Sequence, residues 1–235
     1  MSIINIAIDG PAGAGKSSVA KEVSKRLGFI YIDTGALYRA IAYYVYSKGV
    51  QDFATEKVVP LLDEVNIELK YIQDVQRVFV NGIDVSDYIR TPNISLGASK
   101  VSAIPEVRSF LLYLQRDIAR TNSVIMDGRD IGTVVLPNAD LKIFLTASPE
   151  ERANRRYNQL KDTPNCPCWE QILEDINQRD YNDIHRDIAP LKQSEDAILL
   201  DTSDMTQDQT ITHILSLVRE ISWRLLRNIF TFGVI

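Results

Sequence analysis

A glycine-rich stretch near the start of the chain constrains the fold more than any other feature. Residues 10–17 read Gly-Pro-Ala-Gly-Ala-Gly-Lys-Ser and fit the pattern G-x-x-x-x-G-K-[ST]. A short apolar run at 3–8 precedes this stretch, and a helical pattern at 16–27 follows it. A strand, a glycine loop and a helix in that order make a phosphate-binding loop, because the loop N–H groups and the helix N-terminus face one anion. The stretch therefore predicts an α/β protein that binds a nucleoside triphosphate.

The residues of this loop have separate expected tasks. Lys16 is expected to bridge the β- and γ-phosphates, and the Ser17 hydroxyl is expected to bind Mg²⁺. Mg²⁺ is therefore the expected cofactor, together with ATP as the phosphoryl donor. The predicted ATP-binding residues of the loop are Gly10, Pro11, Ala12, Gly13, Ala14, Gly15, Lys16, Ser17 and Ser18.

Short apolar runs and helical patterns alternate along much of the remaining chain. The runs at 29–33, 124–127, 141–145 and 197–201 predict four more buried strands. Helical patterns follow at 35–48, after Ser148 and after Thr206, where the last two begin with capping boxes. This alternation predicts a five-stranded parallel sheet flanked by helices.

The middle of the chain departs from this alternation. Residues 66–71, 77–80 and 83–85 are predicted to be three short strands, and Asn81-Gly82 predicts a tight hairpin between the last two. A small antiparallel insertion is therefore expected within the parallel α/β fold. A second irregular region, at about 160–190, is polar and charged.

Charge, cysteine content and hydropathy exclude several classes of protein. The net charge is −5 over 235 residues, so no basic field attracts nucleic acid, and anions must be held by local clusters of Lys and Arg. Cys166 and Cys168 are too close to join distant segments and are expected to be free thiols. The chain shows no signal peptide and no apolar run long enough to span a bilayer, which predicts a cytoplasmic protein with no membrane association.

The pattern of charged residues favours a small kinase among the P-loop proteins. No glycine has Asp three positions before it, and N-K-x-D is absent, so the GTPase motifs are missing. Transfer between two phosphates needs little acid–base help, but it needs cations around the migrating group. Asp127 ends a buried strand and is expected near Mg²⁺ or its waters. The candidate arginines follow strands or lie in the polar region: Arg39, Arg108, Arg129, Arg152, Arg155, Arg156, Arg179 and Arg186.

Six stretches of the chain resemble the bacterial cytidylate kinase family. They are residues 9–17, 33–39 (Asp-Thr-Gly-Ala-Leu-Tyr-Arg), 127–135 (Asp-Gly-Arg-Asp-Ile-Gly-Thr-Val-Val), 148–156, 179–186 and 189–191. The resemblance implies a P-loop kinase that transfers the γ-phosphate of ATP to CMP or dCMP. It implies a single domain, 1–235, with a CMP-binding insertion at 34–103 and a helical, mobile lid at 152–188. A monomer that binds small molecules and no nucleic acid is expected.

The resemblance also implies residue roles. The expected catalytic residues are Lys16, Asp127, Arg129, Arg156 and Arg179, with Asp127 reaching the Mg²⁺ on Ser17 through water. Arg156 would lie on the transferring phosphate, and Arg152 on the adenine of ATP. The expected CMP-binding residues are Thr34, Arg39, Arg129 and Arg186 on the phosphate, Arg179 and Asp183 near the phosphate and sugar, and Ser99, Arg108 and Asp130 on the base.

Chemistry supports the expected base readers independently. Cytosine offers an amino donor beside ring acceptors, which suits a carboxylate with a guanidinium. Uracil reverses part of this pattern and would leave buried polar groups unpaired.

Two other functions remain open from the residues. One is a small P-loop kinase for AMP or shikimate, against which residues 127–135 argue. The other is a nucleotide-sensing binding protein without turnover, against which the intact Lys16, Ser17 and Asp127 argue. Thr34 departs mildly from the family pattern, where serine is common. The apolar tail at 227–235 is expected to pack on the core rather than to form a contact surface.

Overall fold

The computed structural model describes residues 3–73, 75–163 and 166–231, with the side chains of the last helix described as far as Ile221. The chain divides into two compact units. The first, here the P-loop unit, comprises Met1–Ile30, Asn122–His185 and Ala189–Ile235. The second, here the antiparallel unit, comprises Tyr31–Thr121 and Arg186–Ile188. Each unit is described by itself, and the predicted insertion boundaries at 34–103 and 152–188 stay predictions.

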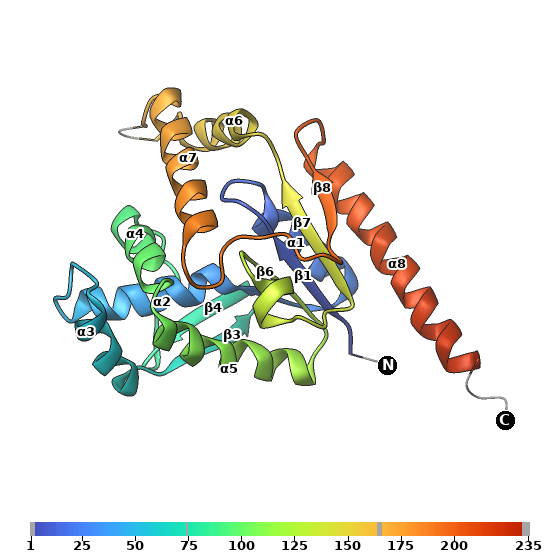
Figure 1. Ribbon diagram of the computed structural model, residues 1–235, viewed down its shortest axis with the longest axis horizontal. Coiled ribbons are helices and arrows are strands. Elements are labelled where there is room, and N and C mark those ends of the chain that lie inside the picture. The colour runs from blue at the N-terminus through green and yellow to red at the C-terminus, as the bar shows by residue number, and fades with distance from the viewer. Residues whose placement is uncertain (1–2, 74, 164–165, 232–235) are drawn as a thin grey trace. The chain divides into compact units, whose positions relative to one another are not determined.

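A five-stranded sheet confirms the predicted α/β class (Figure 1). Its order is β2-β6-β1-β7-β8. Strands β6 and β7 each pair parallel with β1, and β8 pairs parallel with β7. Central strands of a parallel sheet are buried on both faces, which explains why their sequences are continuous apolar runs. The strands are β1 (Asn5–Asp9), β2 (Ile30–Asp33), β6 (Val124–Gly128), β7 (Leu141–Thr146) and β8 (Ile198–Asp201).

Two helices of the P-loop unit, α1 and α6, each have one end at a predicted signal. Helix α1 (Lys16–Leu27) ends at Gly28, whose φ of 70° is the left-handed conformation that glycine adopts readily. Helix α6 (Pro149–Leu160) starts where the Ser148 hydroxyl accepts from the Glu151 N–H at 3.2 Å. Helix α7 (Trp169–His185) packs on α6 around Ala153, Ile172 and Ile176.

The last helix, α8 (Gln207–Thr231), begins with the predicted capping box. Thr206 and Gln209 exchange two side-chain-to-backbone hydrogen bonds, at 2.8 and 3.2 Å. Ile211, Ile214 and Val218 are buried on one face, as the helical pattern predicts. The backbone of α8 runs to Thr231, but the predicted packing of the tail, 227–235, concerns side chains and end residues outside the described part.

The antiparallel unit contains the predicted small sheet. Strands β3 (Ile67–Ile72), β4 (Val75–Val80) and β5 (Ile83–Asp84) pair antiparallel in that order. Asn81 and Gly82 both have positive φ, 49° and 80°, which is the tight turn that their sequence predicts. The helices of this unit are α2 (Thr34–Ser47), α3 (Thr55–Val58), η1 (Val59–Glu64), α4 (Pro92–Val101) and α5 (Pro105–Thr121).

Three smaller observations complete the fold. A single π-helical turn, η2 (Ile131–Val135), follows β6 and was not predicted, because five residues are too few to show a period. Cys166 and Cys168 are free thiols, as expected. Within residues 3–73, 75–163 and 166–231, no helix has the length and apolar character needed to cross a membrane.

Candidate active site

The glycine loop joins β1 to α1 and needs its glycines. A Cβ on Gly10 would lie 1.9 Å from the backbone oxygen of Leu145 on β7, so no side chain fits there. Gly13 and Gly15 have φ of 77° and 89°, which side-chain-bearing residues rarely adopt. The left-handed Gly15 is also the N-cap of α1, so the loop leads directly into the helix N-terminus. The predicted strand–loop–helix unit is therefore present.

Lys16 is buried within this loop. Its Nζ donates to the backbone oxygen of Pro11 at 2.7 Å, and the residue is 5% exposed. Burial lowers the pKa of Lys16 well below its ordinary value, and the charge of Arg129 lowers this pKa further. Asp127 and Asp9 act in the opposite direction. The loop thus holds a poorly solvated cation, which binds an anion more strongly than a hydrated one.

Ser17 and Asp127 meet beside Lys16. The Ser17 hydroxyl donates to Asp127 Oδ2 at 2.6 Å, although 110 residues separate them in sequence. Asp127 ends β6 and is 4% exposed. A hydroxyl and a carboxylate are hard oxygen donors and suit Mg²⁺, which usually takes its remaining ligands from water and substrate phosphates. No larger cluster of acidic, His or Cys side chains that could hold a metal occurs in the described part of the chain.

Arg129 is tied to the predicted lid helix within the same unit. Its Nε donates to Asp183 Oδ2 at 2.7 Å, and its Nη1 donates to the Gly128 oxygen at 3.3 Å. Asp183 lies on α7 and is 8% exposed. Arg179, on the same helix, also lowers the pKa of Lys16 through its charge, so it lies within electrostatic reach of the loop. The structure therefore brings Lys16, Asp127, Arg129, Arg179 and Asp183 together.

Arg152 bonds to the protein itself through all three of its guanidinium nitrogens. Its guanidinium donates to the oxygens of Ala147 and Ala12, at 3.0 and 2.9 Å, and to Asp180 Oδ2 at 2.6 Å. The side chain is 3% exposed, and it links the loop to α7. That it lies on the adenine stays a prediction. Asp180 was not predicted, because nothing in the polar sequence of α7 distinguishes it from its acidic neighbours.

The two adjacent arginines on α6 have different surroundings. Arg156 is exposed, and its Nη1 donates to Gln159 Oε1 at 3.3 Å. Arg155 instead donates to the Thr202 oxygen at 2.6 Å, beyond the end of β8, and its Nη1 lies 4.0 Å from where a Cβ on Gly15 would be. The role predicted for Arg156 in the transfer is not tested by this arrangement.

Asp130 follows β6 and precedes η2, with 5% of its surface exposed. The next two backbone amides, those of Ile131 and Gly132, donate to the Asp9 carboxylate at 2.7 Å each. Burial raises the pKa of Asp9 from 3.8 to about 6, while these two hydrogen bonds oppose that rise. Asp9 was not predicted as a site residue, although it opens the first of the six stretches that resemble the family.

In the antiparallel unit, Arg39 and Thr34 lie at the start of α2. Arg39 Nη2 donates to Asp33 Oδ2 at 2.8 Å, while Asp33 Oδ1 accepts from the Ala36 N–H at 2.9 Å and so caps the helix. Arg39 Nε is buried with no hydrogen-bond partner among the described residues. Thr34 is 3% exposed. A guanidinium beside a helix N-terminus is a favourable place for a phosphate.

The predicted base-side residues of this unit lie close to one another. Arg108 on α5 is 8% exposed, and its Nη1 donates to the Ser102 oxygen at 3.2 Å. The Ser102 hydroxyl in turn donates to the oxygen of Ser99, at 2.8 Å. The guanidinium of Arg108 also lies 5.6 Å from the centre of the Tyr38 ring. Arg186 belongs to the same unit and is half-buried.

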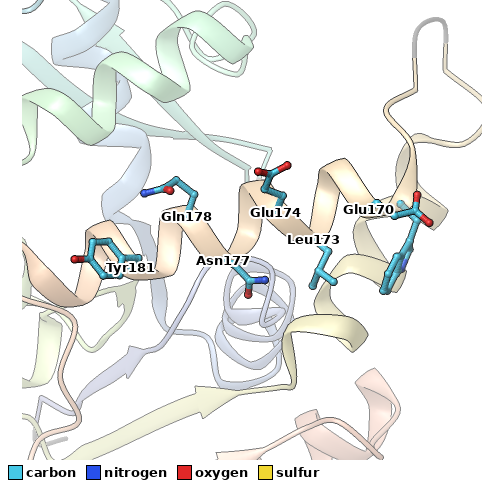
Figure 2. Close-up of a pocket in the computed structure, with 7 residues that line it drawn as sticks. Glu170, Leu173, Glu174, Asn177, Gln178 and Tyr181 are labelled. Atoms are coloured by element: carbon cyan, nitrogen blue, oxygen red, sulfur yellow. The ribbon is translucent and has the colours of Figure 1, made fainter.

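A groove of about 430 Å³ runs along α7 (Figure 2). Its lining residues all belong to this helix: Trp169, Glu170, Leu173, Glu174, Asn177, Gln178 and Tyr181. In Figure 2, Glu174 and Gln178 project to one side of the helix, and Leu173 and Asn177 project to the other. These lining residues include none of the predicted site residues, so the groove does not enlarge the candidate active site.

Comparison with known proteins gives consistent matches. The family model described as cytidylate kinase matches residues 6–220. The cytidylate kinase of Caldicellulosiruptor saccharolyticus is 48% identical over 94% of this chain and 98% of its own length. That of Caldanaerobacter subterraneus subsp. tengcongensis is 50% identical over 92% of this chain and 95% of its own. Among solved structures, shikimate kinase from Bacteroides thetaiotaomicron has 13% identity and a TM-score of 0.47 over 93% of this chain and 99% of that chain, which is too distant to bear on function.

Proposed function

The chain belongs to the cytidylate kinase family, and from this premise we propose that it transfers the γ-phosphate of ATP to CMP or dCMP. The products are ADP and CDP or dCDP. The observation that carries the proposal is the junction of Lys16, Ser17 and Asp127 at the end of β1 and β6. That junction offers one cation and two hard oxygen donors to a triphosphate.

The P-loop unit supplies the donor side of the reaction. Backbone N–H groups of residues 10–18, Pro11 excepted, would hold the β-phosphate, and Lys16 would release the Pro11 oxygen to bind the β- and γ-phosphates. Ser17 would hold Mg²⁺ directly and Asp127 through water, and the bound ion would neutralise charge on the phosphates. Arg152 is proposed to lie on the adenine.

Cations are proposed to stabilise the migrating phosphoryl group. Arg129, Arg156 and Arg179 are proposed to contact it or the acceptor phosphate, where they would stabilise the charge that spreads over its oxygens. The attacking oxygen belongs to a phosphate that is already ionised, so no strong general base is required.

The acceptor is proposed to bind through two sets of residues. Its phosphate would contact Thr34, Arg39, Arg129 and Arg186, and its sugar would lie near Arg179 and Asp183. The unpartnered Nε of Arg39 supports this, because a buried donor without an acceptor favours an incoming anion. Ser99, Arg108 and Asp130 would read the base, with the Asp130 carboxylate accepting from the cytosine amino group.

The enzyme is further proposed to act in the cytoplasm as a monomer on small-molecule substrates, with the segment 152–188 closing as a lid.

Release of ADP by the purified protein tests this function. The assay uses Mg-ATP with CMP, dCMP, UMP, AMP, GMP or shikimate, each supplied separately. Turnover is expected to favour CMP and dCMP strongly. Turnover favouring AMP or shikimate would leave the donor site standing and overturn the acceptor assignments, whereas ATP binding without any turnover would favour a nucleotide sensor.

A single substitution tests the base reader. Asp130→Ala is expected to lose more activity with CMP than with UMP, because only cytosine donates an amino hydrogen to this carboxylate. Equal losses on the two acceptors would contradict the assignment of Asp130.

A further inference from the structure

We propose that Asp9 is a positioning residue that sets the preference for cytosine over uracil by holding the turn on which Asp130 sits. This inference rests on the proposed function, because it requires Asp130 to read the base. Asp9 itself lies at the end of β1, before the glycine loop, and is proposed to act through Asp130 rather than by touching either substrate.

The contacts of Asp9 are bidentate and remote in sequence. Its Oδ1 accepts from the Ile131 N–H and its Oδ2 accepts from the Gly132 N–H, each at 2.7 Å, across 122 and 123 residues. These are the two amides that directly follow Asp130. Hydrogen bonds to an ionised group are stronger than neutral ones, so the pair fixes both the position and the rotation of this peptide segment.

The backbone of Asp130 is thereby held on both sides. Its carbonyl accepts from the Val134 and Val135 N–H groups, at 2.9 and 3.1 Å, within the π-helical turn. Its φ and ψ are −145° and 27°, outside the helical and strand regions, so local preference alone does not maintain them. The bonds from Asp9 supply an anchor that comes from outside the turn.

The anchor is rigid because of where β1 lies. Asp9 pairs in register with Gly128 of β6 on one side and with Phe144 of β7 on the other. The approach is also close: a Cβ on Gly132 would lie 3.3 Å from Asp9 Oδ2 and 3.1 Å from Lys142 Cδ. Such contacts are tighter than most real Cβ contacts, so glycine lets the turn lie directly against the carboxylate.

Loss of this anchor should act on selectivity rather than on turnover alone. The Asp130 carboxylate discriminates by accepting from the cytosine amino group, and uracil presents an oxygen at that position. A turn that can rotate would misplace the carboxylate, which weakens the bond to cytosine and also relieves the repulsion of uracil. The ratio of kcat/KM for CMP to kcat/KM for UMP should therefore fall by about tenfold, the effect of one hydrogen bond to a charged group.

The test compares two isosteric substitutions of carboxylates at opposite ends of β1, one on the strand and one that bonds to it from the turn before β7. Asp9→Asn keeps the side-chain shape but turns an NH₂ group toward one of the two backbone donors. Asp140→Asn is the matched control, because Asp140 Oδ2 accepts from the Asn5 N–H at 2.8 Å, at the opposite end of β1. The measured quantity is the CMP-to-UMP ratio of kcat/KM, which does not depend on the fraction of protein that is active. The ratio is expected to fall for Asp9→Asn and to stay within about twofold of the unsubstituted protein for Asp140→Asn.

A second variant keeps the test decisive if Asp9→Asn folds poorly. Gly132→Ala retains the carboxylate but pushes the turn away from it, and its ratio should fall in the same direction by a smaller factor. An unchanged ratio in Asp9→Asn, or in Gly132→Ala where the first variant does not fold, would overturn the positioning role. An unsubstituted protein that shows no preference for CMP would instead overturn the proposed function and this inference with it.

Discussion

Two arginines, one from each unit, differ in how many of their guanidinium nitrogens donate to the protein itself. In the P-loop unit, Arg152 donates from Nε, Nη1 and Nη2 to three acceptors of the protein itself and is 3% exposed. In the antiparallel unit, Arg39 has an ion pair with Asp33 through Nη2, while its buried Nε has no partner in the described part of the chain. The first guanidinium is saturated in the sense that all three of its nitrogens donate to the protein, whereas the second retains a buried nitrogen without an acceptor.

This contrast extends to the groups around each arginine. Lys16 and Ser17 already donate to Pro11 and Asp127, so a triphosphate must replace internal hydrogen bonds as it binds. An anion beside Arg39 gains a donor without displacing one. Internal bonds that resemble those of the ligand keep a site in shape at low reorganisation cost, whereas an unpaired buried donor costs stability until the ligand arrives. The proposed donor side is thus preformed, and the proposed acceptor side is left open.

The largest effect is expected at the preformed loop. Lys16→Met should lower kcat by about 10³-fold, because it removes the cation nearest the transferring group while keeping the side-chain length. Burial depresses the pKa of Lys16, so the folded state carries a cost for its charge, and the variant should unfold at no lower urea concentration than the unsubstituted protein. ADP release and urea unfolding are the two measurements.

Lys21→Met is the matched control, on the exposed face of the same helix. It should change kcat by less than about twofold, since a solvated lysine contributes little to a distant charge. Equal losses in both variants would mean that the general positive charge of α1, and not Lys16 in the loop, supports the transfer.

Asp9 offers a pH-dependent test on the same unit. Its folded-state pKa of about 6 lies above the ordinary 3.8, so the folded protein holds a proton that the unfolded chain has released. The stability that this group contributes is complete below about pH 4 and is lost as pH rises through about 6. The unfolding free energy of the unsubstituted protein minus that of Asp9→Asn should therefore fall by up to about 3 kcal/mol across this range.

The groups that act on Asp9 give this prediction its sign. Burial raises the pKa most, Asp130 adds to the rise, and the two backbone amides with Lys16 oppose it. Urea unfolding of both proteins at several pH values measures the difference. A difference that stays constant or rises with pH would show that Asp9 is not desolvated as the structure has it.

Local patterns predicted the glycine loop, the order of strands and helices, and the hairpin at Asn81-Gly82. These features depend on neighbouring residues, such as the glycine spacing of the loop and the turn preference of Asn-Gly. The glycine-loop motif predicted Lys16, the end of a buried strand predicted Asp127, and the resemblance implied roles for Arg129 and Asp183. The structure brings these four residues together in one unit. Their detailed roles toward substrates stay predictions.

The missed site residues depend on long-range partners. Asp9 is an ordinary strand-end acid in the sequence, and its bonds reach amides 122 and 123 residues away. Asp180 is a site residue because it accepts from Arg152, 28 residues before it, and Arg152 also donates to the carbonyl oxygen of Ala12 in the glycine loop. No periodicity or motif encodes such pairs, because each depends on how distant segments pack.

On the open side, Arg39→Ala should raise KM for CMP by about 30-fold, as expected for a lost charge-assisted contact to phosphate. KM for ATP should not change. The unfolding free energy should change by less than about 1 kcal/mol, because Asp33 keeps its bond to the Ala36 amide and the unpartnered Nε disappears.

Arg77→Ala is the control from the same unit, since Arg77 also pairs with carboxylates, Asp84 and Asp87. It should leave KM for CMP unchanged while lowering stability as much as Arg39→Ala or more. A rise of KM in both variants would remove the distinction between an open arginine and a saturated one.

The smallest effect concerns the saturated arginine itself, and it compares the ion pairs of two arginines on α6: a buried pair that reaches α7 and a partly exposed pair within α6. Asp180→Asn leaves Arg152 with its two carbonyl acceptors but without its counter-charge, and should lower the unfolding free energy by about 1.5 kcal/mol. Glu151→Gln, which weakens the partly exposed pair with Arg155, should cost no more than about 0.5 kcal/mol. Urea unfolding of the two variants measures both. Equal costs would mean that the carbonyl oxygens of Ala12 and Ala147 alone hold Arg152 in position. The ion pair with Asp180 would then not hold α7 to the loop.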